Sequence, residues 1–327
     1  MDFTDLPDLA SARVGGRALF ANDEFFAARG NLVKPEPAVF IPGKYTARGK
    51  WMDGWETRRR RTPGHDWCVL QLGLRGIVRG VDVDTRHFVG NEPERASIEV
   101  CDLPGTPTRA ALEKARWTEI LAPSPCAPGA SNPYAVSATA PATHVRLNIF
   151  PDGGVARLRV YGEVAVDPSR IAGKRVDLAA ITNGGVVLAV SDEHFGARGH
   201  LILPGRSRSM ADGWETRRRR GPGHDWAIVK LGLPGRLDRV EIDTSHFKGN
   251  YPESFSLEAA HAPGATAAEL REGGAWQEIL ARTKLAPHAR RAFPRLAAPG
   301  PFTHVRLRIY PDGGIARLRV YGRAETD

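Results

Sequence analysis

Two clusters of polar residues in the first half of the chain could carry out acid–base chemistry on a small anion. The first cluster contains Glu56, the arginines at 58–61, His65 and Asp66, and it lies between two tryptophans. It supplies a carboxylate and an imidazole for proton transfer, guanidinium groups for an anionic substrate, and aromatic walls that exclude water. Such a set fits the hydrolysis of a small acid.

The members of this cluster also have structural interpretations. Each arginine at 58–61 fits a structural role, on a solvated face or a salt-bridged edge, as well as it fits a functional one. Trp55 and Trp67 are more typical of a core or a pocket wall than of a catalytic group, because tryptophan mainly contributes buried area. His65 and Asp66 are adjacent, and adjacent residues on a strand point to opposite faces, so they need not share a site.

The second cluster consists of Asp84, His87 and Asn91. Asp84 ends a predicted strand, and the other two residues follow in a loop, where functional groups are often held by a rigid scaffold. A carboxylate with histidines could bind a divalent metal, but the absence of His-x-x-x-His and Cys-x-x-Cys spacings argues against a dedicated zinc site. No cofactor is certain, and Asp84 is equally suited to cap the backbone amides of a turn.

Both clusters occur twice, because the chain is an internal duplication. The string Asp-Gly-Trp-Glu-Thr-Arg-Arg-Arg-Arg at 53–61 returns unchanged at 212–220. Asp84, His87 and Asn91 return as Asp243, His246 and Asn250. The offset between the two strings is 159 residues (212 minus 53), which is far longer than a solenoid unit, so each copy should be a complete domain.

We place the first domain at 1–166 and the second at 167–327, because Asp-Pro-Ser at 167–169 breaks regular structure. The first copy also carries extra residues around 35–42, which predict a longer surface loop.

Within each copy the hydrophobic pattern is that of β-structure. Short runs rich in branched residues and bounded by Gly and Pro predict strands, which in the first copy are 66–72, 77–84, 144–150 and 157–161. Short Ala-rich helices are expected at 110–115 and around 265–270, and Pro-Asp-Gly-Gly at 151–154 predicts a hairpin turn. The predicted fold is all-β, with two tandem jelly-roll sandwiches of the galactose-binding-like kind.

Bulk composition excludes several classes of protein. The chain has 327 residues, 42% of them hydrophobic and 25% charged, and a net charge of +9 that fits either a nucleic-acid partner or a small anionic ligand. Its three cysteines lack pairable spacing, and no signal peptide or membrane-spanning segment is apparent, so a cytoplasmic protein is expected. No nucleotide-binding fingerprint or serine-hydrolase elbow is present.

The sequence resembles the allantoicase family. The resemblance is strongest in the segment 50–61 followed by Gly-His-Asp-Trp at 64–67, continues through Val-Asp-Val-Asp-Thr at 81–85 and Gly-Asn at 90–91, and covers nearly the whole chain. It implies two jelly-roll repeats and the hydrolysis of allantoate to ureidoglycolate and urea. Allantoate is a small carboxylate with two ureido arms, which suits an arginine clamp and amide-binding groups.

From the resemblance and the clusters together we expect the following site. The residues expected in proton transfer are Glu56, His65, Asp66 and Asp84 with their copies Glu215, His224, Asp225 and Asp243, and those expected to hold the substrate are Arg58, Arg59 and Asn91 with Arg217, Arg218 and Asn250. The expected partner is allantoate, with neither nucleic acid nor membrane, in a homo-oligomer.

Two alternatives stay open at this point. The copies differ at Lys50-Trp51-Met52 against Ser209-Met210-Ala211, and at Glu92 against Tyr251, so the sequence does not decide which copy is catalytic. A non-catalytic tandem sandwich that binds a carbohydrate or another small ligand is the rival hypothesis. The paired acid, imidazole and guanidinium groups exceed what sugar binding requires.

Overall fold

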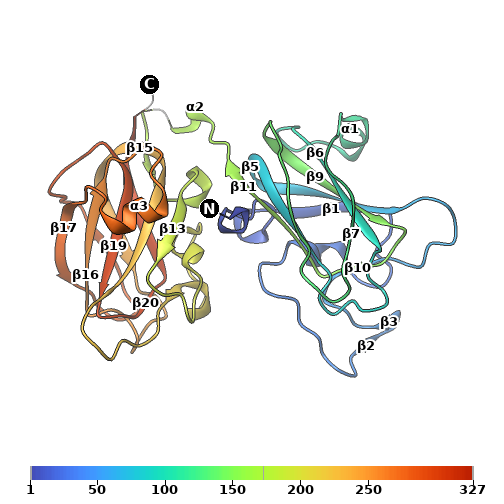
Figure 1. Cartoon of the computed structure of the whole chain (residues 1–327), viewed down its shortest axis with the longest axis horizontal. Coiled ribbons are helices and arrows are strands. Elements are labelled where there is room, and N and C mark those ends of the chain that lie inside the picture. Colours follow the sequence, from blue (N-terminus) through green and yellow to red (C-terminus); the bar gives the residue numbers. More distant parts are fainter. Residues whose placement is uncertain (1, 172, 326–327) are drawn as a thin grey trace. The chain divides into compact units, whose positions relative to one another are not determined.

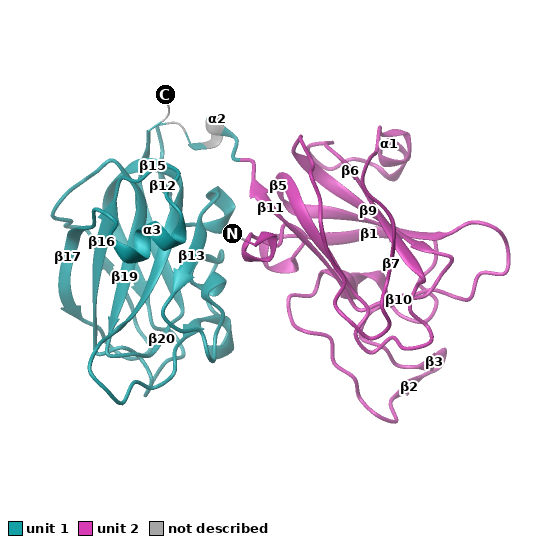
Figure 2. Cartoon of the chain, viewed as in Figure 1, with its two compact units in different colours: residues 1, 166–327 teal, residues 2–165 magenta. Residues whose placement is uncertain are grey.

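The chain folds into two compact units. The computed structural model describes residues 2–171 and 173–325. One unit spans Asp2–Ala165 and the other begins at Val166 (Figure 2). We call them the first repeat and the second repeat, and each buries its own apolar core, around residues such as Val81 and Leu147 in the first and Val240 and Leu307 in the second.

Strands are the main regular secondary structure of the first repeat. Its elements are the 3-10 helices η1 (Phe3–Asp5), η2 (Ala12–Val14) and η3 (Arg29–Val33), the helix α1 (Arg109–Lys114), and the strands β1 (Arg17–Ala21), β2 (Tyr45–Thr46), β3 (Gly49–Lys50), β4 (Trp55–Glu56), β5 (Asp66–Asp84), β6 (Arg95–Cys101), β7 (Thr118–Pro125), β8 (Pro133–Ala135), β9 (Ala142–Phe150), β10 (Gly154–Val155) and β11 (Arg157–Val164).

The long strand β5 organises this repeat. Its first half pairs with β1 and β9, whereas its second half pairs with β11 and β8. The main sheet path runs β1-β5-β9-β6-β7, and every pairing along it is antiparallel. Because the two halves of β5 have different partners, one strand takes part in both layers of the sandwich (Figure 1).

The second repeat reproduces this plan. Its elements are α2 (Pro168–Ile171), β12 (Arg175–Asp177), η4 (Ile181–Asn183), β13 (Val186–Val190), η5 (Arg198–Ile202), η6 (Met210–Asp212), β14 (Trp214–Glu215), β15 (Asp225–Asp243), β16 (Ser254–Ala260), α3 (Ala267–Glu272), β17 (Gln277–Lys284), β18 (Arg290–Phe293), β19 (Phe302–Tyr310), β20 (Gly314–Ile315) and β21 (Arg317–Ala324). Strand β15 corresponds to β5 and pairs with β13, β19, β21 and β18.

The predicted all-β fold of two tandem jelly rolls is confirmed, with differences in detail. The two runs expected at 66–72 and 77–84 form one continuous strand, β5, and the short helices lie where they were expected, as α1 and α3. The predicted hairpin at 151–154 is wrong, because β9 pairs with β5 and β6 whereas β10 pairs with β4. No helix in the part of the chain that the structure describes is long and apolar enough to cross a membrane.

The clearest difference between the repeats is a loop after η3 and η5. Val33 and Asp53 are 20 positions apart, whereas Ile202 and Asp212 are 10 apart, so the first repeat carries ten more residues here. Matched hydrogen bonds locate them. In the first repeat the Ala38 carbonyl contacts His87 Nε2, and the Val39 amide donates to Asp53. In the second repeat the Ser207 carbonyl contacts His246 Nε2, and the Arg208 amide donates to Asp212.

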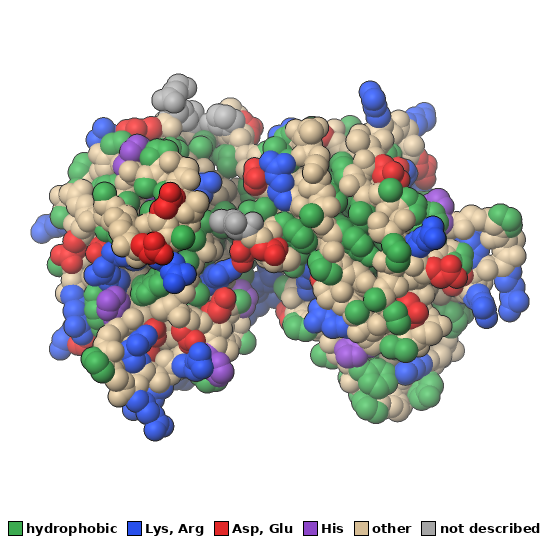
Figure 3. Space-filling model, viewed as in Figure 1, with side chains coloured by type: hydrophobic (Ala, Val, Ile, Leu, Met, Phe, Trp, Pro, Cys, Tyr) green, Lys and Arg blue, Asp and Glu red, His purple; other side chains and the backbone are tan. Residues whose placement is uncertain are grey.

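The additional residues therefore lie between Val39 and Asp53. We match Ser209, which directly follows Arg208, with Phe40, so that the additional residues are 41–50, which we call the inserted loop, rather than around 35–42 as expected. This loop forms the small hairpin β2–β3. Ile41 and Tyr45 are exposed on it, as are Val39 and Phe40 just before it. Figure 3 shows hydrophobic side chains gathered at this tip of the first repeat.

Candidate functional site

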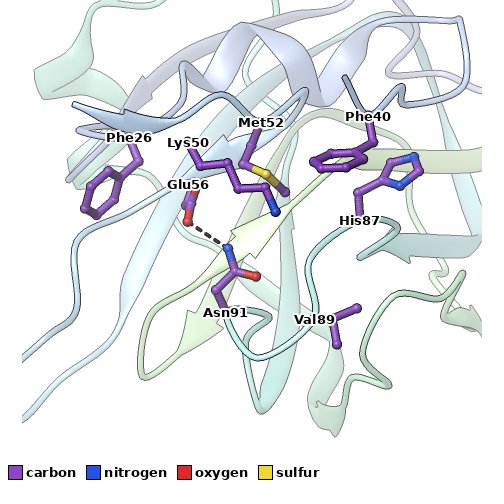
Figure 4. Close-up of a pocket in the computed structure, with 8 residues that line it drawn as sticks. All are labelled: Phe26, Phe40, Lys50, Met52, Glu56, His87, Val89 and Asn91. Atoms are coloured by element: carbon purple, nitrogen blue, oxygen red, sulfur yellow. Dashed lines mark hydrogen bonds between the residues drawn. The ribbon is translucent and has the colours of Figure 1, made fainter. Parts of the chain in front are cut away.

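A pocket of about 370 Å³ opens in the first repeat between the inserted loop, strand β4 and the loop that follows β5 (Figure 4). Its lining residues are Phe26, Phe40, Lys50, Met52, Glu56, His87, Val89 and Asn91. The pocket contains one carboxylate, one imidazole, one amide and one ammonium group among apolar walls. This composition is typical of a site for a small polar ligand.

Strand β4 positions Glu56. Its neighbour Trp55 is fully buried, and the Trp55 indole Nε1 donates to the Asp23 carbonyl oxygen at 2.8 Å. Because successive side chains of a strand point to opposite faces, burying Trp55 turns Glu56 toward the pocket. The Glu56 amide donates to the Ala27 carbonyl, and the pairing of β4 with β10 places Glu56 opposite Gly154.

Phe88 fixes the loop that carries His87 and Asn91. Its ring is fully buried, and a Cβ added to Gly54 or Gly154 would lie within 2.7 Å or 2.0 Å of it. The Gly-Trp-Glu and Asp-Gly-Gly strings therefore need glycine so that an aromatic ring can pack against the backbone. The Gly154 amide also donates to the Asn91 carbonyl at 2.7 Å, which holds the loop beside β4.

Glu56 and Asn91 form the polar centre of the pocket. The Asn91 side-chain amide donates to Glu56 Oε1 at 2.8 Å. Burial raises the pKa of the Glu56 carboxyl, while the Asn91 hydrogen bond and the charge of Lys50 oppose this rise. A carboxylate that is fixed at one oxygen and has a raised pKa is suited to accept a proton at the other oxygen.

The inserted loop and the residues beside it supply the remaining walls. Lys50 ends the inserted loop, and its Nζ lies 4.5 Å from the centroid of the Phe40 ring. Met52 is buried in a cluster with Ala27 and Phe88. Lys50 is the only lysine or arginine among the described residues that line this pocket.

The second repeat keeps part of this arrangement. Asn250 donates its side-chain amide to Glu215 Oε1, and His246 Nε2 contacts the Ser207 carbonyl oxygen at 3.0 Å. Ser209 follows in the position of Phe40, and the shorter loop leaves no counterpart of Lys50. The polar centre is thus duplicated, whereas the cationic and aromatic wall belongs to the first repeat.

Asp66 and Asp225, which were predicted to transfer protons, lie outside the pocket in buried ion pairs. Asp66 Oδ1 accepts from Arg60 Nη2 at 2.6 Å and from Asn22 Nδ2 at 2.8 Å. Asp225 accepts in the same way from Arg219 and Ser191. These contacts join the start of the long strand to the arginine run.

The predicted substrate-binding arginines lie on the surface. Arg58 donates to Asp23, and Arg217 donates to Asp192. Their side chains are 64% and 69% exposed, so these ion pairs are strongly solvated. Arg59 and Arg218 are exposed as well.

Asp84 and Asp243 are buried at the ends of the long strands. Asp84 accepts from the backbone amide of Arg86 at 2.8 Å and from its guanidinium at 2.6 Å. Asp243 accepts from the Ser245 amide at 2.8 Å. Both therefore make the turn-capping contact that was the alternative to a functional role.

His65 and His224 face other parts of their repeats. The His65 ring lies 4.7 Å from that of Phe150, and the His224 ring lies 5.1 Å from that of Tyr310. Burial and three neighbouring arginines lower the pKa of His224. The structure thus brings Glu56 and Asn91 together but leaves the other predicted residues of the first repeat elsewhere.

The donors expected for a divalent metal are not assembled. Among residues 2–171 and 173–325, no group of three or more His, Cys, Asp or Glu side chains is arranged to hold a metal ion. In the pocket, Glu56 shares one oxygen with Asn91, and His87 Nε2 is engaged by the Ala38 carbonyl at 3.1 Å. We therefore assign no metal to this pocket.

Sequence reasoning missed the contributions of Lys50, Phe40 and Met52. One signal was available, because Lys50-Trp51-Met52 is a point at which the copies differ. The sequence contains no periodic pattern, however, that would show which side chains of an irregular loop turn toward a pocket.

Comparison with known proteins places these features in a family. The family model described as "Allantoicase repeat" matches residues 7–165 and again 176–325. The protein named "Probable allantoicase 1" from Burkholderia mallei is 52% identical over 320 residues, covering 96% of this chain and 94% of that protein. "Probable allantoicase" from Ralstonia nicotianae is 51% identical and covers 99% of this chain and 97% of its own.

A solved structure supports the same family assignment. The crystal structure of allantoicase from Saccharomyces cerevisiae is 33% identical to this chain and superposes with a TM-score of 0.84, covering 97% of this chain and 92% of that one. The similarity therefore extends through both repeats.

Proposed function

The chain belongs to the allantoicase family, and we propose that the pocket of the first repeat is where it hydrolyses allantoate to ureidoglycolate and urea. The observation that supports this location most strongly is the hydrogen bond between Glu56 and Asn91 beside Lys50. These side chains offer a base, an amide and a cation within one small cavity. A ureido-substituted carboxylate requires these three kinds of group.

Lys50 would neutralise the carboxylate of allantoate, and Asn91 would hold a ureido arm. Lys50 is the one lysine or arginine among the described pocket residues, so it is better placed for this than Arg58 or Arg59. Asn91 uses one N–H for Glu56. Its second N–H and its carbonyl oxygen can pair with the carbonyl and N–H of a ureido group.

Glu56 would act as the base that activates water. Its Oε1 is held by Asn91, which leaves Oε2 to accept a proton. Because burial raises its pKa, the carboxylate is a stronger base than one on the surface. In the reaction, water oxygen bonds to the central carbon of allantoate while the bond from that carbon to one ureido nitrogen breaks.

The second repeat would then serve chiefly as scaffold. It retains Glu215 and Asn250 but has Ser209 in place of Phe40 and no counterpart of Lys50. We also propose a homo-oligomer that acts in the cytoplasm without nucleic acid. Three buried, unpaired cysteines support a reducing compartment. Light scattering of the purified protein would measure the oligomeric state.

The assignment is tested by incubating the purified chain with allantoate, with and without prior chelation, and measuring urea and ureidoglycolate. Equal amounts of both products are expected. Loss of activity on chelation would reveal a metal that the donor arrangement does not predict. If folded protein released no urea under either condition, the binding-module hypothesis would replace the enzyme.

A further inference from the structure

The departing urea nitrogen needs a proton, and the proposed pocket contains a second group that can supply it. Breaking the bond between carbon and nitrogen without protonation would release an unstable amide anion, so general-acid help is expected. Glu56 is assigned to water and Lys50 to the carboxylate. His87 is the remaining titratable side chain among the described residues that line the pocket.

The backbone of His87 is held in an unusual conformation. Its φ is 72°, in the left-handed region that non-glycine residues rarely adopt. The turn is fixed by the Phe88 amide, which donates to the Thr85 carbonyl at 2.8 Å, and by buried Phe88. Backbone strain of this kind persists where the surrounding structure imposes it, and such residues often lie at functional sites.

One ring nitrogen of His87 is committed and the other is available. Nε2 lies 3.1 Å from the Ala38 carbonyl oxygen. A carbonyl can only accept, so Nε2 carries a hydrogen and the remaining proton chemistry belongs to Nδ1. The Phe40 ring stacks on the imidazole, with 6.0 Å between centroids and 27° between planes. The ring is thus fixed on one edge and covered on one face.

We propose that His87 is the general acid of this site and donates the proton on Nδ1 to the departing urea nitrogen, an inference that rests on the proposed function. Figure 4 shows His87 and Phe40 on one side of the pocket and Glu56 with Asn91 on the other. A substrate between them would meet the base and the acid on opposite sides. His87 is exposed, so urea would leave toward solvent.

The proton transfers balance. Water gives a proton to Glu56 Oε2, and its oxygen bonds to the central carbon. The electron pair of the broken bond stays on the urea nitrogen, which takes the proton from His87. One proton then passes from Glu56 to His87 through solvent and restores both groups.

Several other charged groups lie in the pocket or on the segments around His87. Glu56 and Lys50 share the pocket, Asp84 and Arg86 lie on its own segment, and Lys34, Glu36, Asp53 and Arg157 belong to the contacts of the adjoining segment at 34–40. Most of these are ion-paired: Asp84 with Arg86, and Asp53 with Lys34 and Arg157. Glu56 and Lys50 are therefore the charged groups that share the pocket with His87 and stand outside these ion pairs.

The second repeat provides a matched control. His246 has the same φ of 72° and the same contact with a carbonyl, at Ser207. Its backbone amide, however, donates to His288 Nδ1 at 2.7 Å, and Ser209 replaces the stacking phenylalanine. His246 thus repeats the structural role of His87 without the wall that completes the pocket.

The test compares the pH dependence of kcat for the full chain and for the variants His87→Gln, His246→Gln and Glu56→Gln. Glutamine can still donate to the Ala38 carbonyl through its amide but cannot act as an acid, so folding is preserved while proton donation is lost. We expect His87→Gln to lower kcat by about 100-fold or more and to abolish its fall at alkaline pH. His246→Gln should keep the full bell-shaped profile.

The outcomes separate the two proposals. If Glu56→Gln is inactive while His87→Gln keeps the alkaline limb of the wild type, the pocket is the site but His87 is not its acid. If Glu56→Gln is fully active, the proposed location itself fails. A circular dichroism spectrum and a melting temperature equal to those of the wild type would show that His87→Gln is folded.

Discussion

The two repeats share one scaffold and differ in what was added to it. Both contain the buried tryptophan of the Gly-Trp-Glu string, the phenylalanine packed on two glycines, and the Asn–Glu hydrogen bond. Only the first carries the inserted loop at 41–50 and the pocket wall that depends on it. The identical strings thus carry both the scaffold and the polar groups Glu56 and Asn91, whereas the difference between the copies adds the cationic and aromatic wall of the first repeat's pocket.

Removing the inserted loop should have the largest effect. Deleting residues 41–50 gives the first repeat the loop length of the second and removes Lys50 and the support for Phe40. We expect kcat/KM to fall by about 1,000-fold or more, because substrate positioning and charge neutralisation are lost together. Steady-state urea release measures this, with circular dichroism as the check on folding. Retention of wild-type activity would mean that the loop forms no part of the site.

The next largest effect is expected from Lys50, and it can be compared with that of the arginines predicted from the sequence to bind the substrate. Lys50→Met should lower kcat/KM by roughly 10-fold to 100-fold, mainly through KM, because one charge-assisted contact to the carboxylate is lost. Arg58→Met, which removes an ion pair with Asp23 and a cation–π contact with Phe25, both outside the pocket, should stay within about 3-fold of the wild type. A larger loss of kcat/KM in Arg58→Met than in Lys50→Met would show that the arginine, and not Lys50, binds the carboxylate of the substrate.

A smaller effect on kcat/KM is expected from removing the side-chain amide of Asn91. Asn91→Ala should lower kcat/KM by roughly 5-fold to 10-fold, the equivalent of one hydrogen bond. The Asn91 hydrogen bond lowers the pKa of Glu56, so its removal should raise that pKa further and move the acidic limb of the activity profile to higher pH. Asn250→Ala is the control and should leave the profile in place. An unmoved acidic limb in Asn91→Ala would argue against Glu56 as the base.

The smallest expected effect concerns stability and leaves activity at neutral pH unchanged. Burial lowers the pKa of His304 to about 4, and it also lowers that of His144 in the first repeat. Between the ordinary histidine pKa of about 6.5 and the folded value, the unfolded chain binds a proton that the folded chain does not. Stability should therefore fall as pH falls through this window, by at most about 3 kcal/mol for His304.

Denaturant unfolding at neutral and mildly acidic pH checks this expectation. His304→Gln should lose more of the pH dependence than His144→Gln, since the charge of Lys230 adds to burial in lowering the pKa of His304, whereas the charge of Asp102 opposes burial at His144. Equal pH dependence in the wild type and both variants would show that neither buried histidine controls acid stability.

Much of this molecule could be predicted from its sequence, for physical reasons that also explain the failures. Alternating apolar residues and glycine-bounded runs predicted the strands, and Glu56 and Asn91, two of the predicted site residues, meet in the pocket. Asp66 was predicted as catalytic but lies in an ion pair with Arg60. A sequence lists carboxylates and guanidiniums without showing which of them neutralise each other.

The inserted loop was harder to interpret. Its extra length was recognised, but its position was predicted around 35–42 instead of 41–50. The contacts that align the copies, between Ala38 and His87 and between Ser207 and His246, join residues far apart in the chain. Tertiary contacts of this kind leave no local pattern.

The location of the working site in the first repeat is best tested by comparing Glu56→Gln with Glu215→Gln. The two glutamates have the same string around them and the same asparagine partner, so the variants are chemically matched. We expect Glu56→Gln to lower kcat for urea release by about 100-fold or more, while Glu215→Gln stays within about 3-fold of the wild type. Equal losses in both variants, or a loss in Glu215→Gln alone, would contradict this location.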